Sequence, residues 1–127
     1  MKLLLDTHAF LWFVTGDRRL SRTARAALDA ESAELYLSAA SVWEMAIKSS
    51  LARLILPAPL TDYVAEKLAE GFRVLPVDWK HTAIVERLPF HHRDPFDRML
   101  VCQAIVLGMT ILTPDPLVAQ YPARTIW

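Results

Sequence analysis

The chain has 127 residues, enough for one domain, 1–127, whose hydrophobic core needs no disulfide to be stable. Its formal charge of zero at pH 7 excludes a protein that binds nucleic acids through overall positive charge, and no apolar window is long enough to cross a membrane. The single cysteine excludes an internal disulfide, and Asp6 and His8 interrupt the apolar start, so we expect a cytoplasmic protein without a signal peptide.

The chain begins with three consecutive leucines, Leu3 to Leu5, which are followed directly by Asp6. A short continuous apolar run predicts a strand covered on both faces, as in a parallel sheet between helices. Asp6 then stands at the carboxyl end of that strand, where open α/β sheets bind their ligands. A capping role for the next helix, predicted over 7–14, would also explain Asp6.

The second predicted helix, 21–28, lies in an arginine-rich stretch and can be capped by Ser21. Arg18 and Arg22 belong to this stretch and are candidates for contacts with nucleic-acid phosphates. A solvated helix face is the simpler interpretation of the same arginines, and both interpretations stay open at this point.

A second short strand, 35–37, ends at Ser38 and precedes a helix predicted over 39–51. The segment Ser41 to Glu44 has the spacing of a capping box, whereas a cap at Ser38 would place Glu44 almost two turns into the helix. Glu44 borders an apolar stripe that predicts the core face, so its carboxylate needs a partner. The stripe consists of Ala40, Trp43, Ile47 and Leu51.

The middle of the chain predicts a helix over 60–70, a strand over 72–75 and a helix over 79–87 capped by Asp78. Leu60, Val64 and Leu68 form the expected apolar face of the first of these helices. The polar turn that follows contains two adjacent histidines, which are not the ligand spacing of a zinc site.

Asp94-Pro95-Phe96-Asp97 is the strongest helix start in the chain, because it combines an Asp cap, a first-position proline and a first-turn acid. The helix over 95–107 is apolar nearly all round, which predicts a buried central helix. A strand over 109–112 ends in Thr113-Pro114-Asp115, and a last strand covers 124–126. This alternation of strands and helices predicts an α/β sandwich around a parallel sheet of four to five short strands.

Four acids share one position in such a fold. Asp6 and Asp115 follow strands, and Glu44 and Asp97 belong to helices whose amino ends lie at the same edge of the sheet. Carboxylates this close repel one another unless a divalent cation binds them, most often Mg²⁺ or Mn²⁺. Sites of this kind perform phosphoryl transfer, with the metal activating a water. Thr7 and Thr113 are placed to orient the carboxylates.

The segments that carry these acids resemble the PIN-domain ribonucleases, specifically the VapC-type toxins of toxin–antitoxin pairs. The matching segments are Leu3 to His8, Ser38 to Glu44, His92 to Arg98, and Thr113 to Asp115. Their order and spacing match along essentially the whole chain. The resemblance implies a PIN-like, Rossmann-like fold and metal binding by Asp6, Glu44, Asp97 and Asp115.

The resemblance also implies a Mg²⁺-dependent endoribonuclease, a homodimer, and an antitoxin that blocks the acidic site with a cationic side chain. We expect the metal-binding acids to be supported by Thr7, Ser38, Asp94 and Thr113. The candidate RNA contacts are Arg18, Arg22, His92, Arg93 and Arg98. RNA as the substrate rests on the resemblance alone.

Two other functions fit parts of the sequence. A phosphatase could use Asp6 as its nucleophile, but that chemistry usually needs a second acid two residues later, where this chain has His8. An inactive PIN-like module could bind a partner or RNA without cleaving it. The presence of all four acids argues against a decayed site.

Overall fold

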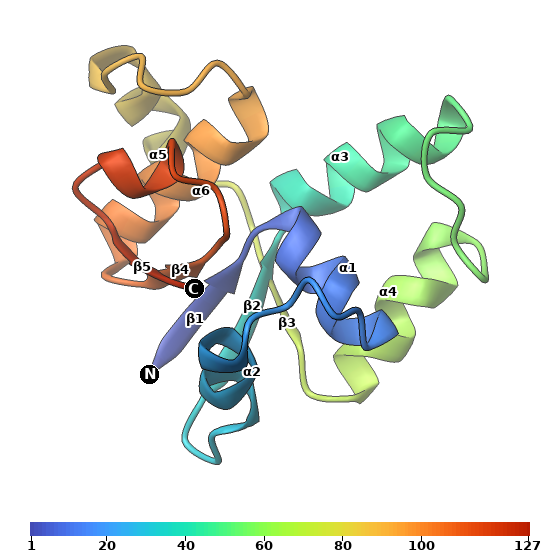
Figure 1. Cartoon of the computed structure of the whole chain (residues 1–127). Helices are drawn as coiled ribbons and strands as arrows, with labels where there is room; N and C mark the ends of the chain where they lie inside the picture. Colours follow the sequence, from blue (N-terminus) through green and yellow to red (C-terminus); the bar gives the residue numbers. More distant parts are fainter.

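The computed structural model describes residues 1–127 and places one parallel sheet between two layers of helices (Figure 1). The five strands stand in the order β3-β2-β1-β4-β5, so the chain reverses its direction of winding beside the central β1. Their bounds are β1 Lys2–Leu5, β2 Glu34–Ser38, β3 Arg73–Leu75, β4 Thr110–Leu112 and β5 Arg124–Ile126. The predicted α/β sandwich with a short-stranded parallel sheet is therefore confirmed.

The helices begin where capping residues were expected. Ser21, Ser38, Asp78 and Asp94 each accept a main-chain N–H at the start of the helix that follows them. Ser38 caps α3, so of the two alternatives for this helix the Ser38 cap is confirmed and the capping box at Ser41 to Glu44 is excluded. The bounds are α1 Thr7–Thr15, α2 Arg22–Asp29, α3 Ala39–Ser50, α4 Leu60–Ala69, α5 Trp79–Ile84 and α6 Pro95–Leu107, with 3₁₀ turns at Val85–Arg87 and Val118–Gln120.

The core has one part on each face of the sheet, and the leucines of β1 divide between them. Leu3 and Leu5 pack with Phe10 on the face covered by α1 to α4. Leu4 packs with Leu100 and other residues on the face covered by α6. All three leucines are fully buried, as the continuous apolar run predicted.

Two helices bury a different face from the one predicted. In α3, Trp43 is 64% exposed, whereas Glu44 and Met45 are buried. In α4, Leu60 packs against the core as predicted, whereas Leu68 is exposed and Tyr63 is buried. The apolar stripes had the period of a helix, but the rotation of each helix is set by its packing against the rest of the chain.

None of the helices has the length and hydropathy that crossing a membrane requires.

Candidate active site

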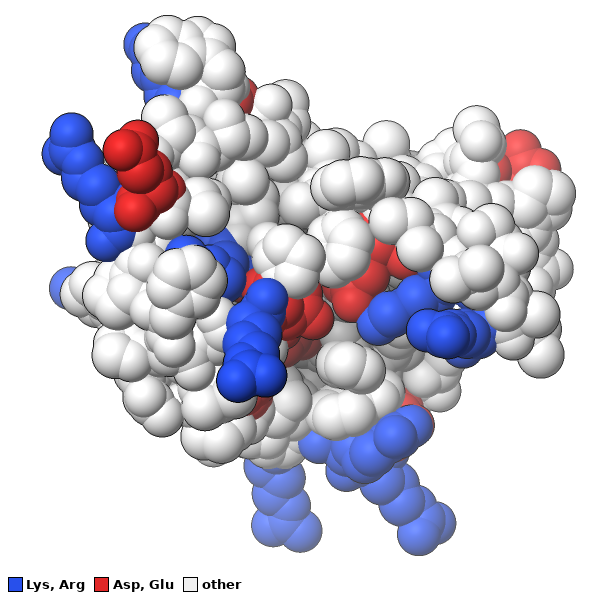
Figure 2. All heavy atoms as spheres, turned by 90° about the horizontal axis from the view of Figure 1, so that it is seen from above, with Lys and Arg blue, Asp and Glu red and all other residues white.

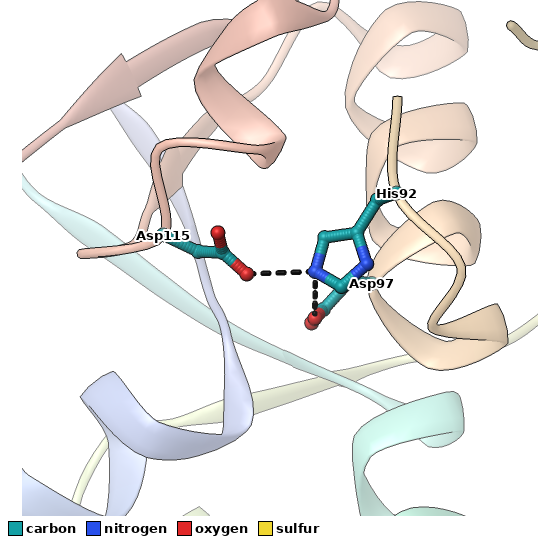
Figure 3. A group of neighbouring side chains, drawn as sticks. All are labelled: His92, Asp97 and Asp115. Atoms are coloured by element: carbon teal, nitrogen blue, oxygen red, sulfur yellow. Dashed lines mark hydrogen bonds and ion pairs between the residues drawn. The ribbon is translucent and has the colours of Figure 1, made fainter. Parts of the chain in front are cut away.

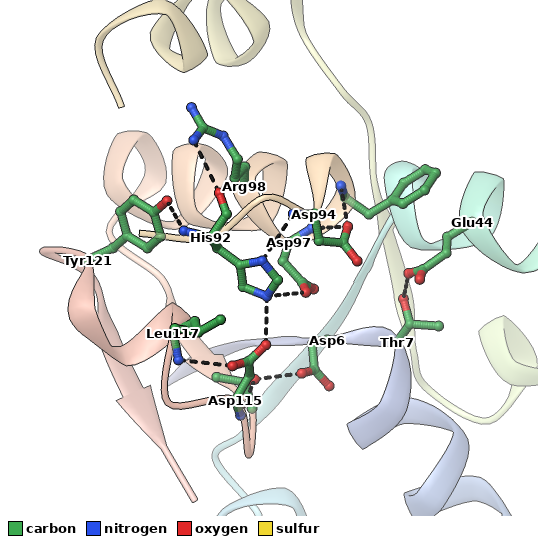
Figure 4. Close-up of polar contacts among 12 residues, drawn as sticks. Asp6, Thr7, Glu44, His92, Asp94, Asp97, Arg98, Asp115, Leu117 and Tyr121 are labelled. Atoms are coloured by element: carbon green, nitrogen blue, oxygen red, sulfur yellow. Dashed lines mark hydrogen bonds and ion pairs between the residues drawn. The ribbon is translucent and has the colours of Figure 1, made fainter. Parts of the chain in front are cut away.

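All four predicted acids converge at the carboxyl edge of the sheet (Figure 4). Asp6 follows β1, Asp115 follows β4, Glu44 lies in α3 and Asp97 lies in the first turn of α6. Seen from above this edge, acidic atoms gather in a central hollow that has basic side chains on both sides (Figure 2). The hollow is located beside β1, where the strand order reverses and ligands bind in α/β sheets.

Asp6 is both a helix cap and a member of the acidic cluster. Its Oδ1 accepts the main-chain N–H of Ala9 at 2.7 Å, and its Oδ2 accepts the Thr113 hydroxyl at 2.6 Å. Thr113 also accepts the main-chain N–H of Asp115 at 3.1 Å, so one threonine links two of the acids. Burial raises the pKa of Asp6 above its usual value, although these hydrogen bonds act to lower it.

Glu44 is buried, and both of its carboxylate oxygens have partners. The Thr7 hydroxyl donates to Oε1 at 2.5 Å, and the Lys48 ammonium lies 2.7 Å from Oε2. Thr7 follows Asp6 in sequence, so the end of β1 supplies one acid and the support for another. Lys48, four residues after Glu44 on the same helix, was not among the site residues predicted from the sequence, although its spacing was visible there.

Asp97 is the acid whose charge is least compensated. Burial, with Asp94, Asp6 and Glu44 nearby, raises its pKa to about 7, and His92 opposes this rise. The one polar side chain within ion-pair distance is His92, whose Nε2 lies 3.2 Å from Oδ2 of Asp97. The helix cap is Asp94, which accepts the main-chain N–H groups of Phe96 and Asp97. Asp97 therefore has no capping role.

His92 joins Asp97 to Asp115 (Figure 3). Its Nε2 lies 2.7 Å from Oδ2 of Asp115, and the other oxygen of Asp115 accepts the Leu117 main-chain N–H at 2.9 Å. The Nδ1 of His92 accepts the main-chain N–H of Asp94 at 3.0 Å, so Nδ1 carries no proton and Nε2 does.

The donor set fits a hard divalent cation. His92, Asp97 and Asp115 each offer an atom within 4.8 Å of the others. Since the Nε2 of His92 carries the proton, His92 fits as a hydrogen-bond donor to Asp115 rather than as a metal ligand. The remaining donors are carboxylate oxygens, which Mg²⁺ and Mn²⁺ prefer. The weakly compensated Asp97 is the group that such a cation would stabilise most.

Two residues predicted beside the site have other partners in the structure. The Ser38 hydroxyl donates to Oε1 of Gln103 at 2.7 Å and caps α3, so it holds no carboxylate. Arg98, predicted to contact RNA, is buried and donates to the main-chain carbonyls of four residues. These are Val85, Leu88, Pro89 and His92. Arg98 therefore secures the turn before α6, and its contact with RNA stays a prediction.

The other predicted RNA contacts differ in their position. His92 lies inside the acidic cluster, while Arg93 is exposed and lines a cavity of about 840 Å³ with Trp43 and Phe96. Arg18 and Arg22 are exposed, and their contact with RNA stays a prediction. A second cavity of about 430 Å³ lies on the side of Thr7 and Lys48.

This chain is similar in fold to single chains in the solved structures of toxin–antitoxin complexes. VapBC2 of Rickettsia felis, bound to a promoter DNA fragment, aligns with a TM-score of 0.72 and 12% identity over 98% of this chain and 97% of that chain. VapBC-1 of Haemophilus influenzae aligns with a TM-score of 0.67 and 16% identity over 98% and 96%. A toxin–antitoxin complex of Klebsiella pneumoniae aligns with a TM-score of 0.59 and 16% identity over 89% and 86%.

No curated protein matches the sequence. A family model described as the PIN domain matches residues 3–123, the span that contains all four acids and the sheet except Lys2 of β1 and the whole of β5. The chain therefore belongs to the PIN domain family.

Proposed function

We propose that this chain is a metal-dependent endoribonuclease of the VapC type, the toxin of a toxin–antitoxin pair. The observation that carries this proposal is the placement of Asp97 among three other acids with only His92 to offset its charge. Such a group is costly in the free protein and useful in one that binds a divalent cation. The PIN domain family and the VapBC-like fold support the same conclusion.

The residues that would hold Mg²⁺, or Mn²⁺ in its place, are Asp6, Glu44, Asp97 and Asp115. A metal bound there supplies a Lewis acid and a water of lowered pKa for attack on a phosphodiester. The chain contributes rigid carboxylates, because Thr113 fixes Asp6, Thr7 fixes Glu44, and His92 with the Leu117 N–H fixes Asp115. No side chain needs to become covalently attached to the substrate.

The partners we propose are RNA, an antitoxin and a second copy of the chain. RNA as the substrate follows from the VapC resemblance, with the exposed Arg93, Arg18 and Arg22 as candidate phosphate contacts. An antitoxin side chain with a positive charge would neutralise the acidic hollow and exclude the metal. The named VapBC neighbours support the antitoxin, and the homodimer remains a proposal from the resemblance.

The test is cleavage of a mixed RNA pool by the purified chain, separated from any antitoxin. We expect cleavage with Mg²⁺ or Mn²⁺, none with excess chelator, and discrete new RNA ends. Asp29→Asn is the matched control for Asp97→Asn, because Asp29 is an exposed acid at the end of α2. Undiminished cleavage in excess chelator would refute the metal mechanism, and intact RNA under all conditions would favour the inactive binding module.

No contact in the structure favours the phosphatase. His8, at the position that would need an acid, is exposed and lies against Trp12 with a centroid distance of 5.7 Å. Both oxygens of Asp6 already accept hydrogen bonds, which suits a fixed metal ligand better than a nucleophile.

A further inference from the structure

Lys48 is the one lysine or arginine that forms an ion pair with any of the four acids. Its ammonium lies 2.7 Å from Oε2 of Glu44, whereas Asp97 and Asp115 have the imidazole of His92 beside them. The pair is unevenly exposed, since 41% of the Lys48 side chain is accessible and only 6% of the Glu44 side chain is. A positive charge thus stands at the edge of the acidic hollow, where solvent and substrate can reach it.

The Lys48 ammonium has unused hydrogen-bonding capacity. An ammonium has three N–H donors, and the structure engages one of them, on Glu44. The Thr7 hydroxyl satisfies the other oxygen of Glu44, so Lys48 is not needed to hold both ends of the carboxylate. Two donors therefore remain free for an acceptor that enters from the solvent.

Lys48 lies between Glu44 and a cavity that carries further positive charge. Lys48 and Thr7 line the cavity of about 430 Å³, together with the exposed Arg53. The one further arginine of this cavity, Arg19, is paired with Asp17 at 2.8 Å, and both residues belong to the lining. Arg53 thus adds a positive charge without a paired acid, and Lys48 stands where this cavity meets Glu44.

We propose that Lys48 contacts the scissile phosphodiester of the RNA and stabilises the charge that develops on it during hydrolysis. A phosphate that approaches four carboxylates is repelled, and one divalent cation offsets only part of that charge. Lys48 supplies a second, built-in cation, held in place by Glu44 and free to donate to a phosphate oxygen. This inference rests on the proposed ribonuclease function and makes Lys48 a catalytic residue of that site.

If Lys48 had a purely structural role, its removal would have different effects. Glutamate and lysine spaced four residues apart on a helix often form a stabilising pair without any function. In that case, removing Lys48 would change stability and little else. A role in holding the acids for the metal would instead weaken metal binding.

The experiment compares Lys48→Met and Lys48→Arg with the wild-type chain. Cleavage is measured at saturating Mg²⁺, and Mg²⁺ binding is measured by calorimetry without RNA. We expect Lys48→Met to lose cleavage by about a hundredfold while binding Mg²⁺ at least as tightly, because a positive charge beside Glu44 is gone. Lys48→Arg retains the positive charge and the N–H donors, so it should cleave RNA at a rate within about tenfold of wild type.

Arg73→Met is the matched control, since it removes an exposed ion pair with Glu34 at the opposite end of the strands. Cleavage by Lys48→Met within about threefold of wild type would overturn the inference. Loss of Mg²⁺ binding together with cleavage would also overturn it, because Lys48 would then support the metal. If the wild-type chain itself fails to cleave RNA, the proposed function fails before the lysine variants are compared.

Discussion

Among the four acids, Asp97 differs from the others in what offsets its charge. Asp6, Glu44 and Asp115 each accept two hydrogen bonds or ion pairs from the chain, whereas Asp97 has the single contact with His92 at 3.2 Å. In the metal-free protein, Asp97 is therefore the acid with the least favourable electrostatic surroundings. Substitutions at Asp97 can therefore distinguish the effect of its charge on stability from the effect of its charge on cleavage.

Replacing Asp97 with asparagine should stabilise the metal-free protein and inactivate it. The change removes repulsion from the neighbouring acids and leaves the Asp94 cap intact, so we expect a gain of about 1–2 kcal/mol in unfolding free energy. Cleavage should fall by about a hundredfold or more, since one charged metal ligand is lost. Thermal melts in chelator and cleavage assays test both effects, and normal cleavage with unchanged Mg²⁺ affinity would remove Asp97 from the site.

The stability of the metal-free chain should fall as the pH rises towards neutrality. The pKa of Asp97 is about 7 in the folded protein and 3.8 in the reference state, so the folded chain binds a proton more tightly than the unfolded chain does. This contribution is complete below pH 3.8 and is lost as the pH rises through about 7. Asp97→Asn should flatten that decline in urea titrations, and an equal slope in both proteins would contradict the assignment.

His92 should act through the carboxylates that it holds. His92→Ala removes the donor to Asp115, and we expect about a tenfold to hundredfold loss of cleavage, as for other residues that orient ligands. His92→Gln offers an N–H donor in place of Nε2, so it should lose less cleavage activity than His92→Ala. Mg²⁺ affinity measured in parallel would show whether the loss arises from the metal site, and equal cleavage by all three proteins would exclude this role.

At the scale of elements, the turn before α6 is fixed by a helix residue that points back at it. Arg98 is buried and donates to the carbonyl oxygens of Val85, Leu88, Pro89 and His92, at 3.2 to 3.4 Å. The main-chain carbonyl of His92 is thus held by α6 while its ring reaches the acids (Figure 4). One guanidinium connects the stability of the turn to the geometry of the site.

Arg98→Leu should therefore unfold more easily and cleave more slowly. Four main-chain carbonyls, which are buried or partly buried, each lose a donor, which predicts a loss of about 2–4 kcal/mol in unfolding free energy. Denaturant titration measures this loss, with Arg93→Leu as the control because Arg93 is exposed and makes no hydrogen bond through its side chain. A change below about 0.5 kcal/mol would show that the turn is held by other contacts.

At the scale of the whole molecule, the site lies at the reversal point of a sheet whose two faces are each covered by their own core. Leu3 and Leu5 contribute to one core and Leu4 to the other, so β1 is supported independently of the acids that follow it. We therefore expect the fold to form without a metal. A metal or an RNA bound at the proposed site would meet a surface that is already assembled.

Chelator should accordingly leave the chain folded, and Mg²⁺ should raise its melting temperature. Binding to the folded state alone stabilises it by about 2.7 kcal/mol when Mg²⁺ reaches a hundred times its dissociation constant. Melting curves across a Mg²⁺ series test this, and Asp97→Asn should show little of the increase. A chain that unfolds in chelator would show instead that the metal is part of the core.

The sequence determined the strands, the helix starts and the set of acids. Short apolar runs and Asp and Ser caps act within a few residues, so they can be recognised without a structure. Asp6, Glu44, Asp97 and Asp115 could be grouped because parallel strands end at one edge of a sheet. The structure does bring these four side chains together.

Only the tertiary structure decided which side chains surround the acids. The buried face of α3, the place of His92 beside Asp115 and the burial of Arg98 depend on how segments pack in the folded chain. The ion pair of Lys48 with Glu44 is local, because the two residues lie four positions apart on one helix. A sequence pattern sets the period of a helix but not its rotation against a sheet, because rotation is chosen by packing. The acids and their threonine partners Thr7 and Thr113 could therefore be predicted, whereas the position of His92 between two acids could not.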